Sequence, residues 1–237
     1  MLAGACGVAL AALFGLVGRL RRRPLHPRGV VLPGTLVLEE TDAPGLAELG
    51  GPGRRDVRVR VSRAVGLPRA LPDNQGLAIT WHADDRRHDL LLAGSGTGRV
   101  GRFLLVPRRR VDAGPLSTLM TFVDDAGRQL LLTAVPAAGA RARTTGPGPL
   151  LGGGLDLVLR TARPTGTWHR IGRLTCPPAR EDRAPQDDPT LRFDPVSRVP
   201  GTLTVPDWAA RIRRPVYRRS QLVGRSPVVG TATTGQR

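Results

Sequence analysis

The chain contains one tyrosine, Tyr217, and it lies four positions after Arg213. Residues four apart share one face of a helix. A phenolate can ligate ferric haem iron, and a guanidinium on the same face favours the ionised phenol, whose unperturbed pKa is about 10. We therefore expect Tyr217 to bind a metal and Arg213 to activate it. Pro215 lies between them and can kink the helix, so a surface tyrosine remains the alternative.

Two further groups of residues could handle protons and anions. His26 has a side chain suited to acid–base transfer near neutral pH. Residues 57–62 alternate valine with Arg58, Arg60 and Ser62, which predicts a strand with one polar face. We expect this polar face to line a barrel interior, where buried charges need counter-charges. A surface histidine and a solvated arginine face are the alternatives.

One cluster suggests a different chemistry. His82, Asp84, Asp85, His88 and Asp89 lie close together in the chain, and clustered histidines and aspartates hold the metal ions of phosphodiesterases and related hydrolases. The alternative is a solvated hairpin turn.

The two cysteines, Cys6 and Cys176, have neither CxxC nor zinc-site spacing. Such sparse use of cysteine is typical of a cytoplasmic protein with reduced thiols.

Strands must position these residues. With 30 glycines and 22 prolines, the chain favours short strands joined by turns. We predict a mainly β protein, an antiparallel barrel with flanking helices, in which Pro33 and Gly34 form a turn. The predicted strands are 30–32, 35–38, 57–62, 76–81, 89–93, 102–106, 129–135, 155–160 and 171–175. Residues 137–154 and 177–190 are predicted to be loops.

A short C-terminal helix is predicted to begin at Pro206 and Asp207, residue types that suit a first helical turn. It continues through Arg213, and the residues after Gly224 show no periodicity. The expected organisation is an N-terminal segment 1–23, a barrel domain 24–225 and a tail 226–237.

The N-terminal segment is apolar over residues 2–18, and an arginine cluster follows it. A signal peptide carries its charges before the apolar run, and 2–18 has the lower-limit length for crossing a bilayer. Two interpretations stay open. The segment attaches a cytoplasmic domain to the inner face of the membrane, or it is an apolar helix that packs on its own domain or on a partner subunit of a homo-oligomer.

The net charge is +17, and all 36 basic residues are arginine. An excess of arginine favours nucleic-acid or anionic-membrane partners, but GC-rich coding bias produces it too. Because the arginines are spread along the chain and aromatic residues make up only 3%, no stacking platform for bases is visible. We expect no specific nucleic-acid partner.

Taken in order, these segments resemble the haem catalase superfamily over about residues 20–225. The motifs that carry the resemblance are Leu25-His26-Pro27-Arg28-Gly29, Arg60-Val61-Ser62, Gly76-Leu77-Ala78, Asp89-Leu90, Ile171-Gly172-Arg173-Leu174-Thr175, Phe193-Asp194-Pro195, Val199-Pro200-Gly201 and the stretch from Pro206-Asp207 to Arg213 and Tyr217.

The resemblance implies haem b as cofactor, with Tyr217 as the proximal ligand to its iron. It implies catalytic roles for His26, for Ser62 as the group that orients it, and for Arg213. Cofactor contacts are implied for Arg23, Arg58, Arg60 and Val65, with the arginines pairing with the haem propionates. The implied substrates are a peroxide and a small organic co-substrate.

The chain departs from the catalase pattern near the iron. Catalases place an asparagine shortly after the Asp-Leu pair, whereas this chain offers only Ser95 or Thr97 there. It also ends soon after Tyr217, without the family's wrapping segment and C-terminal helices. We therefore expect a peroxidase that acts on organic or hydrogen peroxide. The alternative is a non-catalytic catalase-like barrel, either a haem binder or a remnant.

Overall fold

The computed structural model describes residues 29–68, 70–138, 154–178 and 191–211. Nine strands, two 3₁₀ helices and a helical segment at residues 207–211 form there. The strands are β1 (Gly29–Leu38), β2 (Gly53–Arg63), β3 (Gln75–Ala83), β4 (Arg86–Gly94), β5 (Leu116–Ser117), β6 (Phe122–Val123), β7 (Gln129–Pro136), β8 (Leu155–Ala162) and β9 (His169–Cys176), and the 3₁₀ helices are η1 (Gly101–Phe103) and η2 (Val111–Ala113).

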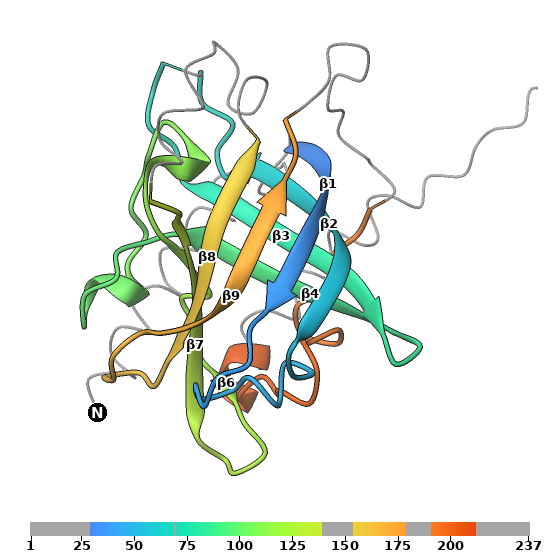
Figure 1. The fold of residues 1–237 in the computed structure, drawn as a ribbon. Helices are drawn as coiled ribbons and strands as arrows, with labels where there is room; N and C mark the ends of the chain where they lie inside the picture. Colours follow the sequence, from blue (N-terminus) through green and yellow to red (C-terminus); the bar gives the residue numbers. More distant parts are fainter. Residues whose placement is uncertain (1–28, 69, 139–153, 179–190, 212–237) are drawn as a thin grey trace, which may run out of the picture.

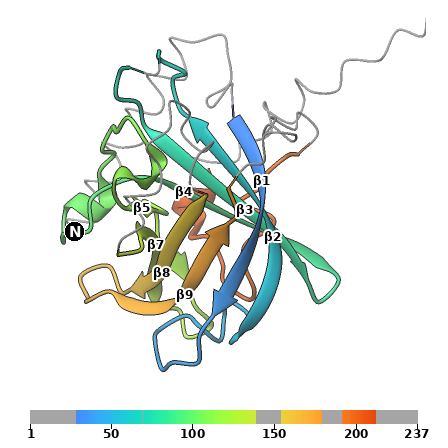
Figure 2. The same ribbon diagram turned by 45° about the horizontal axis from the view of Figure 1, so that its top comes forward.

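The strands close into an antiparallel barrel, as predicted. Their order is β5-β4-β3-β2-β1-β9-β8-β7, and β5 also pairs with β7, so eight strands form a closed ring while β6 extends from β7. Figures 1 and 2 show the long strands β1–β4 crossing behind and beside β7–β9. The closing strand β5 contributes only Leu116 and Ser117 to either neighbour.

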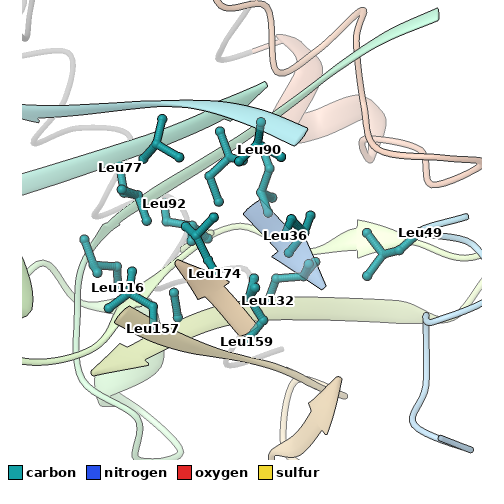
Figure 3. Close-up of a cluster of buried hydrophobic side chains, with 14 of the residues drawn as sticks. Leu36, Leu49, Leu77, Leu90, Leu92, Leu116, Leu132, Leu157, Leu159 and Leu174 are labelled. Carbon is teal, nitrogen blue, oxygen red and sulfur yellow. The ribbon is translucent and has the colours of Figure 1, made fainter. Parts of the chain in front are cut away.

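The inside of the barrel is filled by aliphatic side chains. Leucines from almost every strand converge there, including Leu77, Leu90, Leu132 and Leu174 (Figure 3). With only 3% aromatic residues in the chain, leucine and valine supply most of the apolar area that burial removes from water.

The turn predicted at Pro33 and Gly34 is wrong, because β1 runs through both residues. Pro33 lies opposite Arg58, and Gly34 opposite Val57. The ladder with β9 covers only Thr35 to Leu38 of β1, so the proline, which cannot donate a hydrogen bond, lies before the doubly paired part of the strand. Pairing with β2 along its whole length overrides the local turn signal.

The strand predicted at 102–106 is also wrong. Residues 101–103 form η1, and only Leu105 makes an isolated bridge, to Ser95. Strands β5 and β6 were not predicted. The other predicted strands are confirmed, each within a longer observed strand.

After β9, the described part of the last segment folds back over one end of the barrel. Val199 and Leu203 are buried in the core cluster, and Thr204 bridges to Val123. Residues 207–211 are helical and lie, in Figure 1, at the end of the barrel opposite the start of β1.

The apolar segment 2–18 and the tail lie outside the described residues, so the proposed domain limits stay predictions. Within the described ranges, no helix is long and apolar enough to cross a membrane.

Candidate functional site

The polar face of β2 points outward, which corrects the expectation that it lines the barrel interior. Val57, Val59 and Val61 are the buried residues of the alternation and belong to the core cluster. Arg58, Arg60 and Ser62 therefore share the outer face of the strand. Removing an arginine guanidinium from water costs much more free energy than burying a valine side chain. The valine row of β2 therefore faces the core, and the arginine row faces outward.

On this outer face the strand register aligns small residues beside the polar ones. One row joins Gly29, Ser62, Gly76 and Ala93 across β1–β4. The next row places Arg60 between Val31 and Ala78, and Leu91 follows Ala78. The third row is Pro33, Arg58, Thr80 and Asp89. We call the first two rows the floor.

The floor has a low profile, because most of its side chains are short. Ser62 and Gly76 are buried, whereas Ala78, Leu91 and Ala93 are half-buried. Arg60 is half-buried and lies over the edge of the floor at Gly29, where an added Cβ would come within 2.5 Å of its Cζ. Arg58 is exposed. A broad, mostly apolar surface with guanidinium groups at its edge suits a flat molecule that carries negative charge.

Val65 lies in the loop that follows β2, at the same end as Ser62. The buried Asp73 carboxylate holds this loop by accepting the backbone N–H groups of Val65, Gly66 and Leu67 at 2.8–3.1 Å. Backbone donors of this kind fix a loop without any regular ladder.

The candidate hydrolase cluster is not assembled in the structure, which disfavours that interpretation. Asp84 and Asp85 occupy the β3–β4 turn with positive φ and are exposed. His88 and Asp89 are consecutive strand residues, so their side chains leave on opposite faces. Within the described ranges no group of three histidine, cysteine or acidic side chains could hold a metal ion.

His88 and Asp89 instead hold the C-terminal segment on the barrel. The Asp89 carboxylate accepts the Asp194 N–H at 2.7 Å and the Arg87 Nε–H at 3.0 Å. On the inner side, His88 Nδ1 lies 3.1 Å from the Val199 carbonyl oxygen and 3.3 Å from the Gly201 nitrogen, so it donates to Val199 in one tautomer and accepts from Gly201 in the other. The Phe193-Asp194-Pro195 and Val199-Pro200-Gly201 motifs therefore meet β4 from both faces.

The two weak candidates for the missing asparagine lie in different surroundings. Ser95 is fully buried and its hydroxyl donates to the Gly96 carbonyl at 3.1 Å. Thr97 is exposed, and its carbonyl oxygen accepts the indole N–H of Trp168 at 2.8 Å.

Of the predicted site residues, the structure brings Arg58, Arg60 and Ser62 onto one face, with Val65 in the adjoining loop. His26, Arg23, Arg213 and Tyr217 lie outside the described residues. Sequence reasoning did not identify Gly76, Ala78 and Ala93 as part of a site, although small residues at every second position of β3 and at the end of β4 were a usable signal.

Comparison with solved structures shows that the barrel has a catalase-like fold. The structure is similar to a bacterial catalase (TM-score 0.51, 13% identity, 93% of this chain and 60% of that one) and to a fungal catalase (0.54, 12%, 89% and 60%). It is also similar to catalase A from Saccharomyces cerevisiae (0.57, 11%, 92% and 64%).

At these identities the likeness concerns the fold, and the chain spans about 60–64% of the length of the catalases it matches. No protein-family model matches the chain, and no curated protein is similar to it in sequence.

Proposed function

We propose that the chain is a catalase-related haem protein that reduces organic or hydrogen peroxides, with haem lying on the floor outside β1–β4. The observation that supports this most is the floor itself: small side chains in register on four strands of a catalase-like barrel, with Arg58 and Arg60 beside them. Haem is flat, largely apolar and carries two carboxylates, so the described residues of this face fit it.

Haem supplies an iron centre able to cleave a peroxide O–O bond. The chain would supply the rest. Arg58 and Arg60 would bind the propionates, as guanidinium groups bind carboxylates in two-point contacts. Ser62 would hydrogen-bond one ring nitrogen of His26 and so fix its tautomer. His26 would then be able to move a proton between the two peroxide oxygens.

The register supports the pairing of His26 with Ser62. Gly29 is the cross-strand partner of Ser62 and follows His26 by three residues, which span at most about 10 Å. The distance that the chain must cover is more restrictive for Tyr217, the proposed iron ligand. Arg211 lies at the far end of the barrel, and the six residues to Tyr217 span at most about 20 Å. Tyr217 reaches the floor only if the chain turns back along the outer face.

The test is haem titration of the full-length chain. We expect a Soret band that shifts in Tyr217→Phe, together with weaker haem retention. Ala78→Leu should weaken haem binding roughly tenfold by filling the floor. Its matched control is Thr35→Leu, a substitution on the same outer face of the sheet, opposite Asp56 and away from the floor. If Ala78→Leu and Thr35→Leu bind haem equally, haem does not lie on the floor.

Measuring peroxide turnover distinguishes a peroxidase from a non-catalytic haem-binding barrel. Peroxidase activity would be measured with hydrogen peroxide and with an organic hydroperoxide, using a phenolic reductant. Because the chain has no asparagine shortly after Asp89-Leu90 and the buried Ser95 hydroxyl donates to the Gly96 carbonyl, we expect peroxidase turnover without efficient disproportionation of hydrogen peroxide. A holoprotein that turns over no peroxide would support the alternative, a non-catalytic haem-binding barrel.

A further inference from the structure

A second surface lies away from the floor, in the connection between β4 and β5. Val100 and Leu104 flank the 3₁₀ helix η1 and are 61% and 46% exposed, the former being the most exposed large apolar side chain in the described ranges. Arg99 beside them is exposed as well. We call residues 99–104 the apolar ridge. Figures 1 and 2 show this segment projecting from the side of the barrel, apart from β1.

The apolar ridge is held firmly by Arg102, although its apolar tips are in water. Arg102 is 3% exposed, and its guanidinium donates to the Arg163 and Gly166 carbonyls at 3.1 Å. Its Cζ also lies 4.6 Å from the centre of the Trp168 ring, a cation–π distance. Arg102 thus ties the ridge to the β8–β9 turn.

The backbone of the ridge is equally constrained. Phe103 and Leu104 donate to the Val100 and Gly101 carbonyls at 3.0 and 3.1 Å, and Gly96 donates to Gly101 at 2.9 Å. The loop therefore holds Val100 and Leu104 at fixed positions facing solvent, and a partner that covered both would remove their apolar surface from water.

The charge around the ridge selects the kind of partner. Residues 95–110 contain five arginines. Arg102 and Arg108 are used inside the protein, where they donate to backbone carbonyls, and Arg110 pairs with Asp112. Arg99, in the ridge itself, is exposed and supplies the positive charge at this surface. A second copy of a chain with net charge +17 would meet like charge here. Nucleic acid would pair with the arginines but would leave Val100 and Leu104 without a role, since strands of bases stack on aromatic side chains.

We propose that the apolar ridge docks on an anionic lipid bilayer. Val100 and Leu104 would enter the boundary between headgroups and acyl chains, while Arg99 remains at the level of the lipid phosphates. This contact is separate from the apolar segment 2–18 and does not depend on haem binding.

The test uses the full-length chain with a nitroxide label at Val100→Cys and, separately, at Leu104→Cys, in a Cys6→Ser background. Cys176 is buried and its pKa is raised to about 12 by that burial, so it is not labelled in the folded protein. The matched control is a label at Val37→Cys. Val37 is 37% exposed and lies between Arg54 and Arg173 on the outer face of β1.

With vesicles of equal parts phosphatidylglycerol and phosphatidylcholine, we expect oxygen collisions of the labels at 100 and 104 to rise about threefold or more, because the ridge would be buried about 5–10 Å deep. The label at 37 should stay aqueous, and phosphatidylcholine vesicles alone should give no change.

Three results would overturn the proposal. The protein could sediment with vesicles while both ridge labels stay aqueous, which would assign attachment to another segment such as 2–18. It could fail to bind anionic vesicles. Or the ridge labels could be immobilised by duplex DNA and not by lipid, which would make the ridge a nucleic-acid contact.

Discussion

The Asp89 carboxylate accepts the backbone N–H of Asp194 at 2.7 Å, across 105 positions of the chain. Asp89 is completely buried and also pairs with the guanidinium of Arg87 at 3.0 Å. It is therefore the point at which the C-terminal segment is tied to the outer face of β4, next to the floor.

Removing this carboxylate should release the segment. Asp89→Ala leaves the Asp194 N–H without its acceptor and removes the carboxylate that Arg87 pairs with, and we expect it to lower the free energy of unfolding by about 3–5 kcal/mol, as breaking a buried pair does. Urea unfolding measures this loss, and trypsin should cut faster after Arg192 and Arg198. Asp85→Asn in the exposed β3–β4 turn is the control. Equal stability of the two variants would show that Asp89 does not hold the segment.

Gly201 should not tolerate a side chain. Its φ is +55°, and an added Cβ would overlap the Glu48 carbonyl oxygen. Gly51 has a similar φ of +68° but open space around it, so Gly51→Ala carries only the cost of left-handed backbone, about 1 kcal/mol. We expect Gly201→Ala to cost at least about 3 kcal/mol in thermal or urea unfolding. Similar losses in both variants would mean that the contact with Glu48 does not constrain the fold.

The Cys176 thiol should be inert in the folded protein. Burial raises its pKa to about 12, so the neutral thiol is favoured in the folded state. The resulting stability is present below the unfolded pKa of about 8.5 and falls as pH rises from there toward 12. In a Cys6→Ser background, a disulfide reagent at pH 8 should react only after denaturant is added. Rapid labelling of the native protein would contradict the buried position.

Asp124 should give the barrel part of its acid sensitivity. Burial raises the pKa of this carboxyl, but the Arg128 N–H and the guanidinium groups of Arg163 and Arg128 lower it by more, so its pKa is below the usual range. A lowered folded pKa adds stability above the unfolded value of about 3.9, and that stability is lost as pH falls through the folded pKa. Asp124→Asn should therefore be less stable than wild type at pH 7, and the difference should shrink below about pH 4. A gap that stays constant in urea unfolding at both pH values would exclude this role.

Much of the barrel followed from alternation along the sequence, and its errors have identifiable causes. The alternation of valine and arginine in 57–62 predicted the strand correctly. The expectation that its polar face lines the barrel interior was wrong, because burying guanidinium groups costs too much free energy. Pro33 and Gly34 have the local chemistry of a turn, and only the β2 ladder, formed with residues over twenty positions away, shows that they belong to a strand. The strand predicted from Arg102 onward is wrong because Arg102 is held by the carbonyls of Arg163 and Gly166. These partners are remote in the chain, so the local sequence does not reveal them.

The candidate site was less predictable than the fold. Arg58, Arg60 and Ser62 were identified from one strand, whereas the floor beside them exists only through the register of four strands, which no single segment encodes. The positions of His26, Arg23, Arg213 and Tyr217 stay predictions that the haem titration addresses.

The shortest strand of the closed ring, β5, is where the barrel closure has the fewest backbone contacts. At β5 the circumference is completed by just Leu116 and Ser117, too few residues for a ladder to resist separation by itself. Two hydroxyl groups reinforce this seam: Thr133 Oγ1 donates to the Leu116 carbonyl at 2.7 Å, and Ser117 Oγ to the Arg102 carbonyl at 2.8 Å. If the barrel opens locally, the ladders of β5 should separate first. Amide hydrogen exchange should then be fastest along β5 and the facing edges of β4 and β7.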